Sequence, residues 1–150
     1  MKYLQIFFFS LILLVGSCKD EVAEQLEEDI QLIENYLEDN NLAAEKTSSG
    51  LHFIITKEGT GAHPTINDSV KIKYKGYTLD GSVFNETQGA SSGPWPLTQL
   101  IEGWQEGIPK LKKGGTGVLL IPSKLGYGSQ GQGSIAPNTV LIFDVELIDF

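Results

Sequence analysis

The chain has 150 residues, a formal net charge of −8 and no arginine, and its acidity is confined to one segment. Residues 19–49 hold two Lys against ten Asp or Glu, whereas residues 50–150 hold eight Lys against nine acids. A near-neutral body without a basic patch argues against nucleic acid as a partner, and without Arg no bidentate guanidinium clamp on a phosphate or carboxylate is available. The length fits one domain of ordinary size with an attached segment.

The chain begins with Met1-Lys2, followed by an apolar run over residues 4–15. This run is too short to span a bilayer comfortably and is typical of a signal-peptide h-region. The run leads to Gly16-Ser17-Cys18, and Cys18 is the only cysteine, so an intrachain disulfide is excluded. Small residues directly before a lone cysteine resemble the lipobox of bacterial lipoproteins. The resemblance implies cleavage before Cys18 and acylation of its sulfur and new amine, which together anchor a protein stably. An ordinary signal peptide with an incidental thiol is the alternative.

Lys19 follows the cysteine, where many lipoproteins retained in the inner membrane carry Asp. By that analogy we expect a lipid-anchored protein of the cell envelope, at the outer membrane. The acidic residues after Lys19 also resemble a short surface-export signal, so the domain is expected to face either the periplasm or the cell surface.

Residues 20–39 are predicted to form an acidic amphipathic helix, because apolar residues recur at spacings of three and four and share one face. Asn40 and Asn41 provide a stop. The helix could be a stalk that lifts the domain, a self-association helix or a helix packed on the domain. Its apolar stripe favours the packed roles without choosing between them. The stripe consists of Val22, Leu26, Ile30, Ile33 and Leu37.

Beyond Gly50 the apolar period changes to two, which indicates β-strands with one buried face. Lys71, Lys73 and Lys75 occupy the outward face of one strand and are expected to be solvated. Residues 89–93 are expected to form a flexible loop. The expected strands run from Leu51 to near Gly59 and over residues 70–75, 82–85, 116–122 and 139–149.

The other candidate residues are organised around Trp104, which stands between Gly103 and Gly107. Glycine lets backbone approach closely, and an indole needs a pocket around it. The stretch therefore predicts a short, mostly buried helical turn with Trp104 as the floor of an apolar cavity. Trp104 as an ordinary core residue is the alternative. With the strands, this turn predicts an α+β fold, a mostly antiparallel sheet with one short helix against its concave face.

Conventional catalytic and metal-binding sets are missing from the sequence. His52 and His63 are the only histidines, and neither has a cysteine partner or a nucleophile-like context. Zinc binding and a Ser-His-Asp triad are therefore not expected. Since no Gly-rich phosphate loop precedes a helix, we expect no metal ion and no cofactor.

Four motifs follow one another along residues 50–150. In this order they resemble the FKBP-type peptidyl-prolyl cis-trans isomerases, also called rotamases, over nearly the whole of that range. The resemblance implies an FKBP-like curved antiparallel β-sheet wrapped around one short α-helix, here preceded by the N-terminal acidic amphipathic helix. The motifs are Tyr74-Lys75-Gly76 with Asp80-Gly81 and Phe84, then Leu100-Ile101-Glu102-Gly103-Trp104, then Ile121-Pro122 with Gly126-Tyr127-Gly128, and finally Val140-Leu141-Ile142-Phe143-Asp144-Val145-Glu146-Leu147.

The resemblance also implies a role for each matching residue. Aromatic residues would wall and floor a prolyl pocket, the backbone N–H of Ile101 would bind a substrate carbonyl, and the Tyr127 hydroxyl would hold the peptide. Asn85 stands where the family usually has Asp, so the pocket lacks that carboxylate at its rim. The implied catalytic residues are Tyr74, Phe84, Asn85, Ile101, Trp104, Tyr127 and Phe143, and the implied substrate-binding residues are Trp95, Leu100 and Ile135.

The expected function is peptidyl-prolyl cis-trans isomerisation that assists the folding of exported proteins. An apolar site suffices for it, because it favours the twisted amide over the planar, dipolar one. A non-catalytic proline-peptide binding or chaperone module is the alternative, and an envelope scaffold is a third possibility. Expected partners are proline-containing polypeptides, the membrane through lipidated Cys18, and a rapamycin-type macrolide. The expected divisions are residues 1–17 (signal peptide), 18–46 (lipidated Cys and acidic helical stalk) and 47–150 (isomerase domain).

Overall fold

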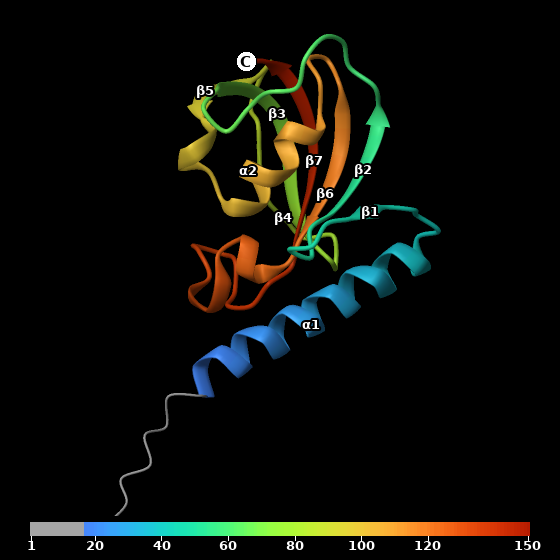
Figure 1. Cartoon of the computed structure of the whole chain (residues 1–150), viewed down its shortest axis with the longest axis vertical. Helices are drawn as coiled ribbons and strands as arrows, with labels where there is room; N and C mark the ends of the chain where they lie inside the picture. The colour runs from blue at the N-terminus through green and yellow to red at the C-terminus, as the bar shows by residue number, and fades with distance from the viewer. Residues whose placement is uncertain (1–16) are drawn as a thin grey trace, which may run out of the picture.

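The computed structural model describes residues 17–150, with side chains from residue 21, so the expected signal peptide lies outside it except for the backbone of Ser17. Seven strands form one antiparallel sheet in the order β1-β2-β6-β7-β3-β4, with β5 paired to β3 (Figure 1). The elements are α1 Ser17–Asp39, β1 Glu45–Lys46, β2 His52–Lys57, β3 Ser69–Thr78, β4 Val83–Glu86, β5 Ser92–Pro96, α2 Glu102–Gly107, β6 Thr116–Ile121 and β7 Leu141–Asp149, with short 3₁₀ turns η1 Leu97–Gln99, η2 Ile108–Lys110, η3 Ser123–Leu125 and η4 Gly128–Gln130.

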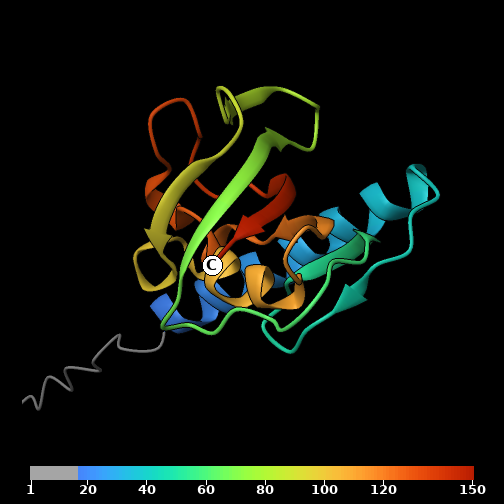
Figure 2. The same ribbon diagram turned by 90° about the horizontal axis from the view of Figure 1, so that it is seen from above.

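Strand β3 organises the sheet because it is long enough to have different neighbours along its length. One edge pairs with β7 from Lys71 to Thr78. The other edge pairs with β5 near its beginning and with β4 near its end, and Figure 2 shows β5 running beside β3. The three lysines on this strand are exposed, as the sequence predicts.

The main core lies between the concave face of the sheet and helix α2. It contains alternate residues of β6 and β7, such as Leu119, Phe143 and Val145, together with Trp104 and Ile108. Alternation along a strand places these side chains on one face and their neighbours on the other. The predicted α+β architecture, a curved antiparallel sheet around one short helix, is confirmed.

Helix α1 packs against the opposite face of the sheet (Figure 1). Ile33 and Leu37 join Leu120 and Ile142 in a second cluster, and Val140 completes it. Of the three roles considered for the acidic helix, packing on the domain is the one observed. Among the described residues, no helix has both the length and the apolar character needed to cross a bilayer.

Helix α1 is also held by a buried carboxylate. Asp29 is 0% exposed, and its Oδ2 accepts hydrogen bonds from the backbone N–H of Ser123 at 2.7 Å and from the Ser123 hydroxyl at 2.6 Å. Its Oδ1 accepts a hydrogen bond from Gln25 on the same helix. A buried charge needs such partners, so this contact ties the helix to the turn that follows β6.

Two strands were not predicted. Residues 92–96 form β5, although residues 89–93 were expected to be a flexible loop and prolines flank Trp95. Proline lacks an N–H for the ladder but is tolerated on edge strands, and β5 pairs only with β3. The two-residue strand β1 is too short to show a period.

His52 lies buried on β2 beneath α1, with 3% of its surface exposed. Its Nδ1 donates a hydrogen bond to the carbonyl oxygen of Gly50, and its Nε2 lies 3.9 Å from Oε1 of Glu34, which pairs with Lys46. Burial lowers the pKa of His52 and outweighs the hydrogen bond to Gly50, which raises it.

The free energy of unfolding of the full chain is expected to decrease as the pH falls from 7 to 5. Below about pH 6.5 an unfolded His takes up a proton, whereas folded His52, with its lowered pKa, takes one up only at a lower pH. The unfolded state then binds more protons and gains stability. Carboxyl groups whose pKa is lowered in the fold also contribute to the free energy of unfolding, but they lose this contribution only below about pH 5. They include Asp68, Asp80 and Asp149.

Urea unfolding at several pH values tests this expectation. His52→Asn, whose amide can replace the donor to Gly50, should flatten the pH dependence between 7 and 5, and His63→Asn is measured beside it for comparison. Equal slopes for the wild type and His52→Asn would contradict it.

Candidate active site

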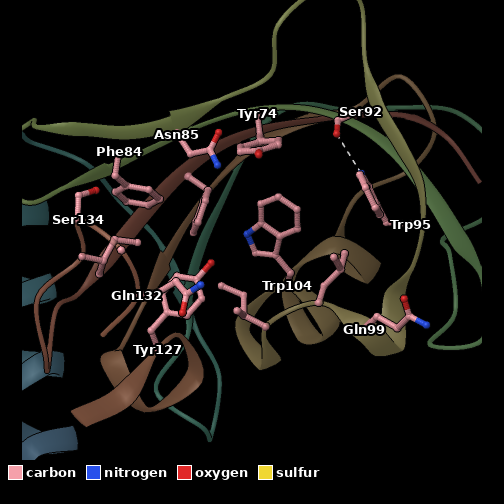
Figure 3. A pocket seen from close by; sticks show the side chains of 15 residues that line it. Tyr74, Phe84, Asn85, Ser92, Trp95, Gln99, Trp104, Tyr127, Gln132 and Ser134 are labelled. Atoms are coloured by element: carbon pink, nitrogen blue, oxygen red, sulfur yellow. Dashed lines mark hydrogen bonds between the residues drawn. The ribbon is translucent and has the colours of Figure 1, made fainter. Parts of the chain in front are cut away.

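A cavity of about 560 Å³ opens between helix α2, the concave face of the sheet and the loop after η3. Figure 3 shows Trp104 at its centre, with Tyr74 above the indole, Trp95 on one side and Phe84 on the other. Fifteen residues line it: Tyr74, Phe84, Asn85, Ser92, Trp95, Gln99, Leu100, Ile101, Trp104, Tyr127, Gln132, Gly133, Ser134, Ile135 and Phe143.

Trp104 lies at the base of this cavity because α2 rests directly on β6. A Cβ atom at Gly103 would lie 2.5 Å from Cγ2 of Ile121, and one at Gly107 would lie 2.7 Å from Cδ1 of Leu119. Only glycine permits so close an approach of helix to strand. Trp104 is 6% exposed and still contributes to the cavity wall.

Two further aromatic rings meet the indole edge-on, and a third ring meets one of these two. The centroid of Trp104 lies 5.0 Å from that of Tyr74 and 5.0 Å from that of Phe143, at interplanar angles of 77° and 78°. Phe84 meets Phe143 at 5.5 Å and 84°. Such edge-to-face pairs each contribute about 0.5–1.5 kcal/mol beyond the area they bury, so the cavity walls hold one another in place.

Gly76 explains how two of these rings reach the cavity from neighbouring strands. Gly76 pairs with Asn85 on one side and with Phe143 on the other. A Cβ atom there would lie 2.6 Å from the ring of Phe84 and 2.7 Å from that of Phe143. The two aromatic rings therefore fill the space that a side chain at residue 76 would occupy.

The loop between η3 and β7 forms the wall opposite Trp95. Tyr127 precedes η4, and Gln132 and Ile135 exchange two backbone hydrogen bonds of 2.9 Å that close the tip of the loop. Ile135 is thereby buried against the main core, while Tyr127 packs on it with its ring partly exposed.

The remaining edge of the cavity comes from β5 and the segment before α2. Trp95 is half exposed and its indole N–H donates a hydrogen bond of 2.9 Å to the hydroxyl of Ser92 (Figure 3). The side-chain amide of Gln105 donates to the carbonyl oxygen of Leu100 at 2.7 Å. The backbone N–H of Ile101 donates no hydrogen bond within the described part of the chain.

The cavity is uncharged, since none of its described lining residues is acidic or basic. Burial, and to a lesser extent the neighbouring Tyr127, raise the pKa of Tyr74, so this phenol is neutral at physiological pH. The indole N–H of Trp104 is buried and, among the described residues, has no hydrogen-bond partner. A buried donor without a partner costs about 1–3 kcal/mol, which an acceptor on a bound ligand could recover.

All ten residues that the sequence singled out for this site line the one cavity. Sequence reasoning missed five others, which are small or polar residues without a hydrophobic period. Neither the spacing nor the residue type of these five marks them in the sequence. The five are Ser92, Gln99, Gln132, Gly133 and Ser134. Cys18 belongs to α1 by its backbone, and its side chain lies outside the description.

Comparison with known proteins gives consistent matches. Residues 60–148 match the family described as FKBP-type peptidyl-prolyl cis-trans isomerase. The chain is 48% identical over 105 residues to a probable FKBP-type peptidyl-prolyl cis-trans isomerase FkpA of Neisseria meningitidis, covering 68% of this chain and 38% of the relative. It is 39% identical over 131 residues to the FkpA isomerase of Aeromonas hydrophila, covering 87% of this chain and 48% of that one.

The crystal structure of FkpA from Escherichia coli superposes with a TM-score of 0.72 at 34% identity, over 87% of this chain and 65% of that one. This similarity confirms the FKBP-like fold that the sequence predicts. The chain spans less than half the length of the two curated relatives described above.

Proposed function

Because the chain belongs to the FKBP-type peptidyl-prolyl cis-trans isomerase family, we propose that it catalyses cis–trans isomerisation of X-Pro bonds in polypeptide clients. The observation that carries this proposal is the uncharged, aromatic-walled cavity above Trp104. The described lining offers no carboxylate, amine or thiol for proton transfer or covalent catalysis, and this reaction needs none.

The reaction is rotation about a peptide bond, whose barrier of about 18–20 kcal/mol comes from amide resonance. Resonance makes the planar bond dipolar, and the dipole weakens as the bond twists. A cavity that excludes water and offers no charges therefore binds the twisted form better than the planar one, and this differential binding lowers the barrier.

Particular residues have particular roles in this proposal. The proline ring sits on the indole of Trp104 between Tyr74 and Phe143. The N–H of Ile101, which has no acceptor within the described residues, binds a substrate carbonyl, and the hydroxyl of Tyr127 holds the peptide. Together these contacts orient the substrate while its central bond remains free to rotate.

Asn85 motivates a second candidate, a proline-peptide binding or chaperone module without useful turnover. Asn85 is exposed at the rim of the cavity, where the family usually has Asp, so the rim carries an amide in place of a charge. The aromatic walls do not depend on that residue, which favours the isomerase.

The anchor and location belong to the proposal as well. We propose that residues 1–17 are removed, that Cys18 is acylated and that the domain acts on exported proteins at the outer membrane of the cell envelope. The support is the lipobox-like run ending at Cys18 and the Lys that follows it.

The central test is isomerisation of a tetrapeptide with one Leu-Pro bond by the full chain in mild detergent. We expect turnover well above the uncatalysed rate, and its abolition by rapamycin, which would compete for the same cavity. Tight rapamycin binding without turnover would favour the binding module, and neither turnover nor binding would favour an envelope scaffold.

Tyr127→Phe removes one hydroxyl and keeps the ring. We expect kcat/KM to fall about fivefold to tenfold, because one hydrogen bond to the peptide contributes about 1 kcal/mol, with unchanged thermal unfolding. Tyr36→Phe, on helix α1 away from the cavity, is the matched control. An unchanged rate would remove the Tyr127 hydroxyl from the site.

Acylation is tested by growing cells with labelled palmitate. The wild-type chain should incorporate the label and fractionate with membranes, whereas Cys18→Ser should do neither, because the thiol is the acceptor. Ser49→Ala, far from the acylation site, controls for expression. Label retained by Cys18→Ser would refute the anchor.

A further inference from the structure

A second hollow of about 530 Å³ lies next to the cavity above Trp104, which is called the prolyl cavity below. It lies between helix α1, the β3–β4 turn and the loop before β7. Phe84, Ser134 and Ile135 line both hollows and form the wall between them. Figure 3 shows Phe84 and Ser134 together at the end of the cavity away from Trp95. The second hollow is lined by Leu32, Thr78, Leu79, Asp80, Ser82, Val83, Phe84, Ser134, Ile135, Ala136, Asn138, Thr139 and Val140.

Two apolar side chains in this hollow are unusually exposed. Leu32 on α1 is 47% exposed and Val83 at the start of β4 is 48% exposed. Leu32 lies outside the apolar stripe that packs α1 on the sheet, so the docking of the helix does not account for it. Apolar surface that lines a concavity and remains open to water is typical of binding sites.

The polar groups of the hollow are mostly engaged with one another. The carboxylate of Asp80 accepts hydrogen bonds from the hydroxyl of Thr78 and from the N–H and hydroxyl of Ser82. The hydroxyl of Thr139 donates to the carbonyl oxygen of Ala136. Asp80 is the only charged residue among the described lining, and its carboxylate already accepts hydrogen bonds from neighbours in its own turn. The hollow therefore offers an apolar contact and no site for an ion.

The shared wall indicates what occupies the hollow. A polypeptide whose proline fills the first cavity must pass over or beside Phe84, Ser134 and Ile135 as it leaves on that side. Only three residues, Phe84, Ser134 and Ile135, line both hollows, and an extended chain advances about 3.3 Å per residue. A residue a few positions from the proline therefore reaches the second hollow.

On the basis of the isomerase function proposed above, we propose that the second hollow is a client subsite. It takes an apolar side chain of the same polypeptide, a few residues from the isomerised proline. Leu32 gives helix α1 a direct part in selecting clients, beyond its packing on the sheet.

The test compares peptides of equal length that contain one Leu-Pro bond. Leu or Ser is placed two, three or four residues from the proline, on either side. For the full chain, we expect the Leu peptide to exceed the Ser peptide in kcat/KM and in affinity by about fivefold to tenfold at one position. That is the effect of partly burying one leucine side chain. Affinity is measured by calorimetry.

The diagnostic variant is Leu32→Gln with Val83→Thr, which keeps side-chain size and local propensity but removes apolar surface. It should bring the Leu-to-Ser ratio close to one. The matched control is Leu42→Gln with Val22→Thr, since both residues are similarly exposed and neither lines the hollow. The control should keep the wild-type ratio.

Different outcomes separate the two proposals. No turnover of any peptide, with the affinity ratio retained, would overturn the isomerase and leave the subsite standing. Turnover with Leu-to-Ser ratios near one at every position, both in kcat/KM and in affinity, would overturn the subsite alone. Sedimentation of the same samples tests whether a second copy of the chain occupies the hollow in place of a client. A wild-type dimer that becomes monomeric in Leu32→Gln with Val83→Thr would show that a second copy fills the hollow, and would also overturn the subsite.

Discussion

The direct contact between helix α2 and strand β6 is the constraint on which the rest of the site depends. Gly103 and Gly107 let the helix backbone settle onto the side chains of Ile121 and Leu119, and this depth sets the height of the Trp104 indole. Tyr74 and Phe143 then meet the indole at equal centroid distances. Because Tyr74, Phe84 and Phe143 lie on paired strands of one sheet, the fold itself holds these three rings in place around the cavity.

The central strands bury both of their faces, each against a different helix. On β6 and β7, Leu119 and Phe143 face α2, whereas Leu120 and Ile142 face α1. The N-terminal helix is therefore part of the hydrophobic core. It also contacts the turn at Ser123 that leads into the Tyr127 loop. Helix α1 therefore supports the Tyr127 wall of the cavity, whereas α2 carries its Trp104 floor on the other face of the sheet.

Elements in which apolar residues recur at a regular spacing were predictable from the sequence. Elements that depend on contacts between residues far apart in the sequence were not. The alternation around Tyr74 and Phe143 identified β3 and β7, and the family resemblance as a whole pointed to ten residues that line the cavity. Strand β5 was missed because Pro94 and Pro96 argue against a strand unless its edge position is known. The burial of Asp29 was also beyond sequence reasoning, since its partner Ser123 lies 94 positions away.

The packed helix α1 has a mechanical consequence for a tethered protein. Its backbone runs without interruption from Ser17 to Asp39, and about 17 Å of helix separates Cys18 from the buried Asp29 at 1.5 Å per residue. A lipid on Cys18, as proposed, would leave no slack linker. The bilayer would then set the tilt of the domain. It would also set the direction from which an unfolded chain reaches the opening of the cavity.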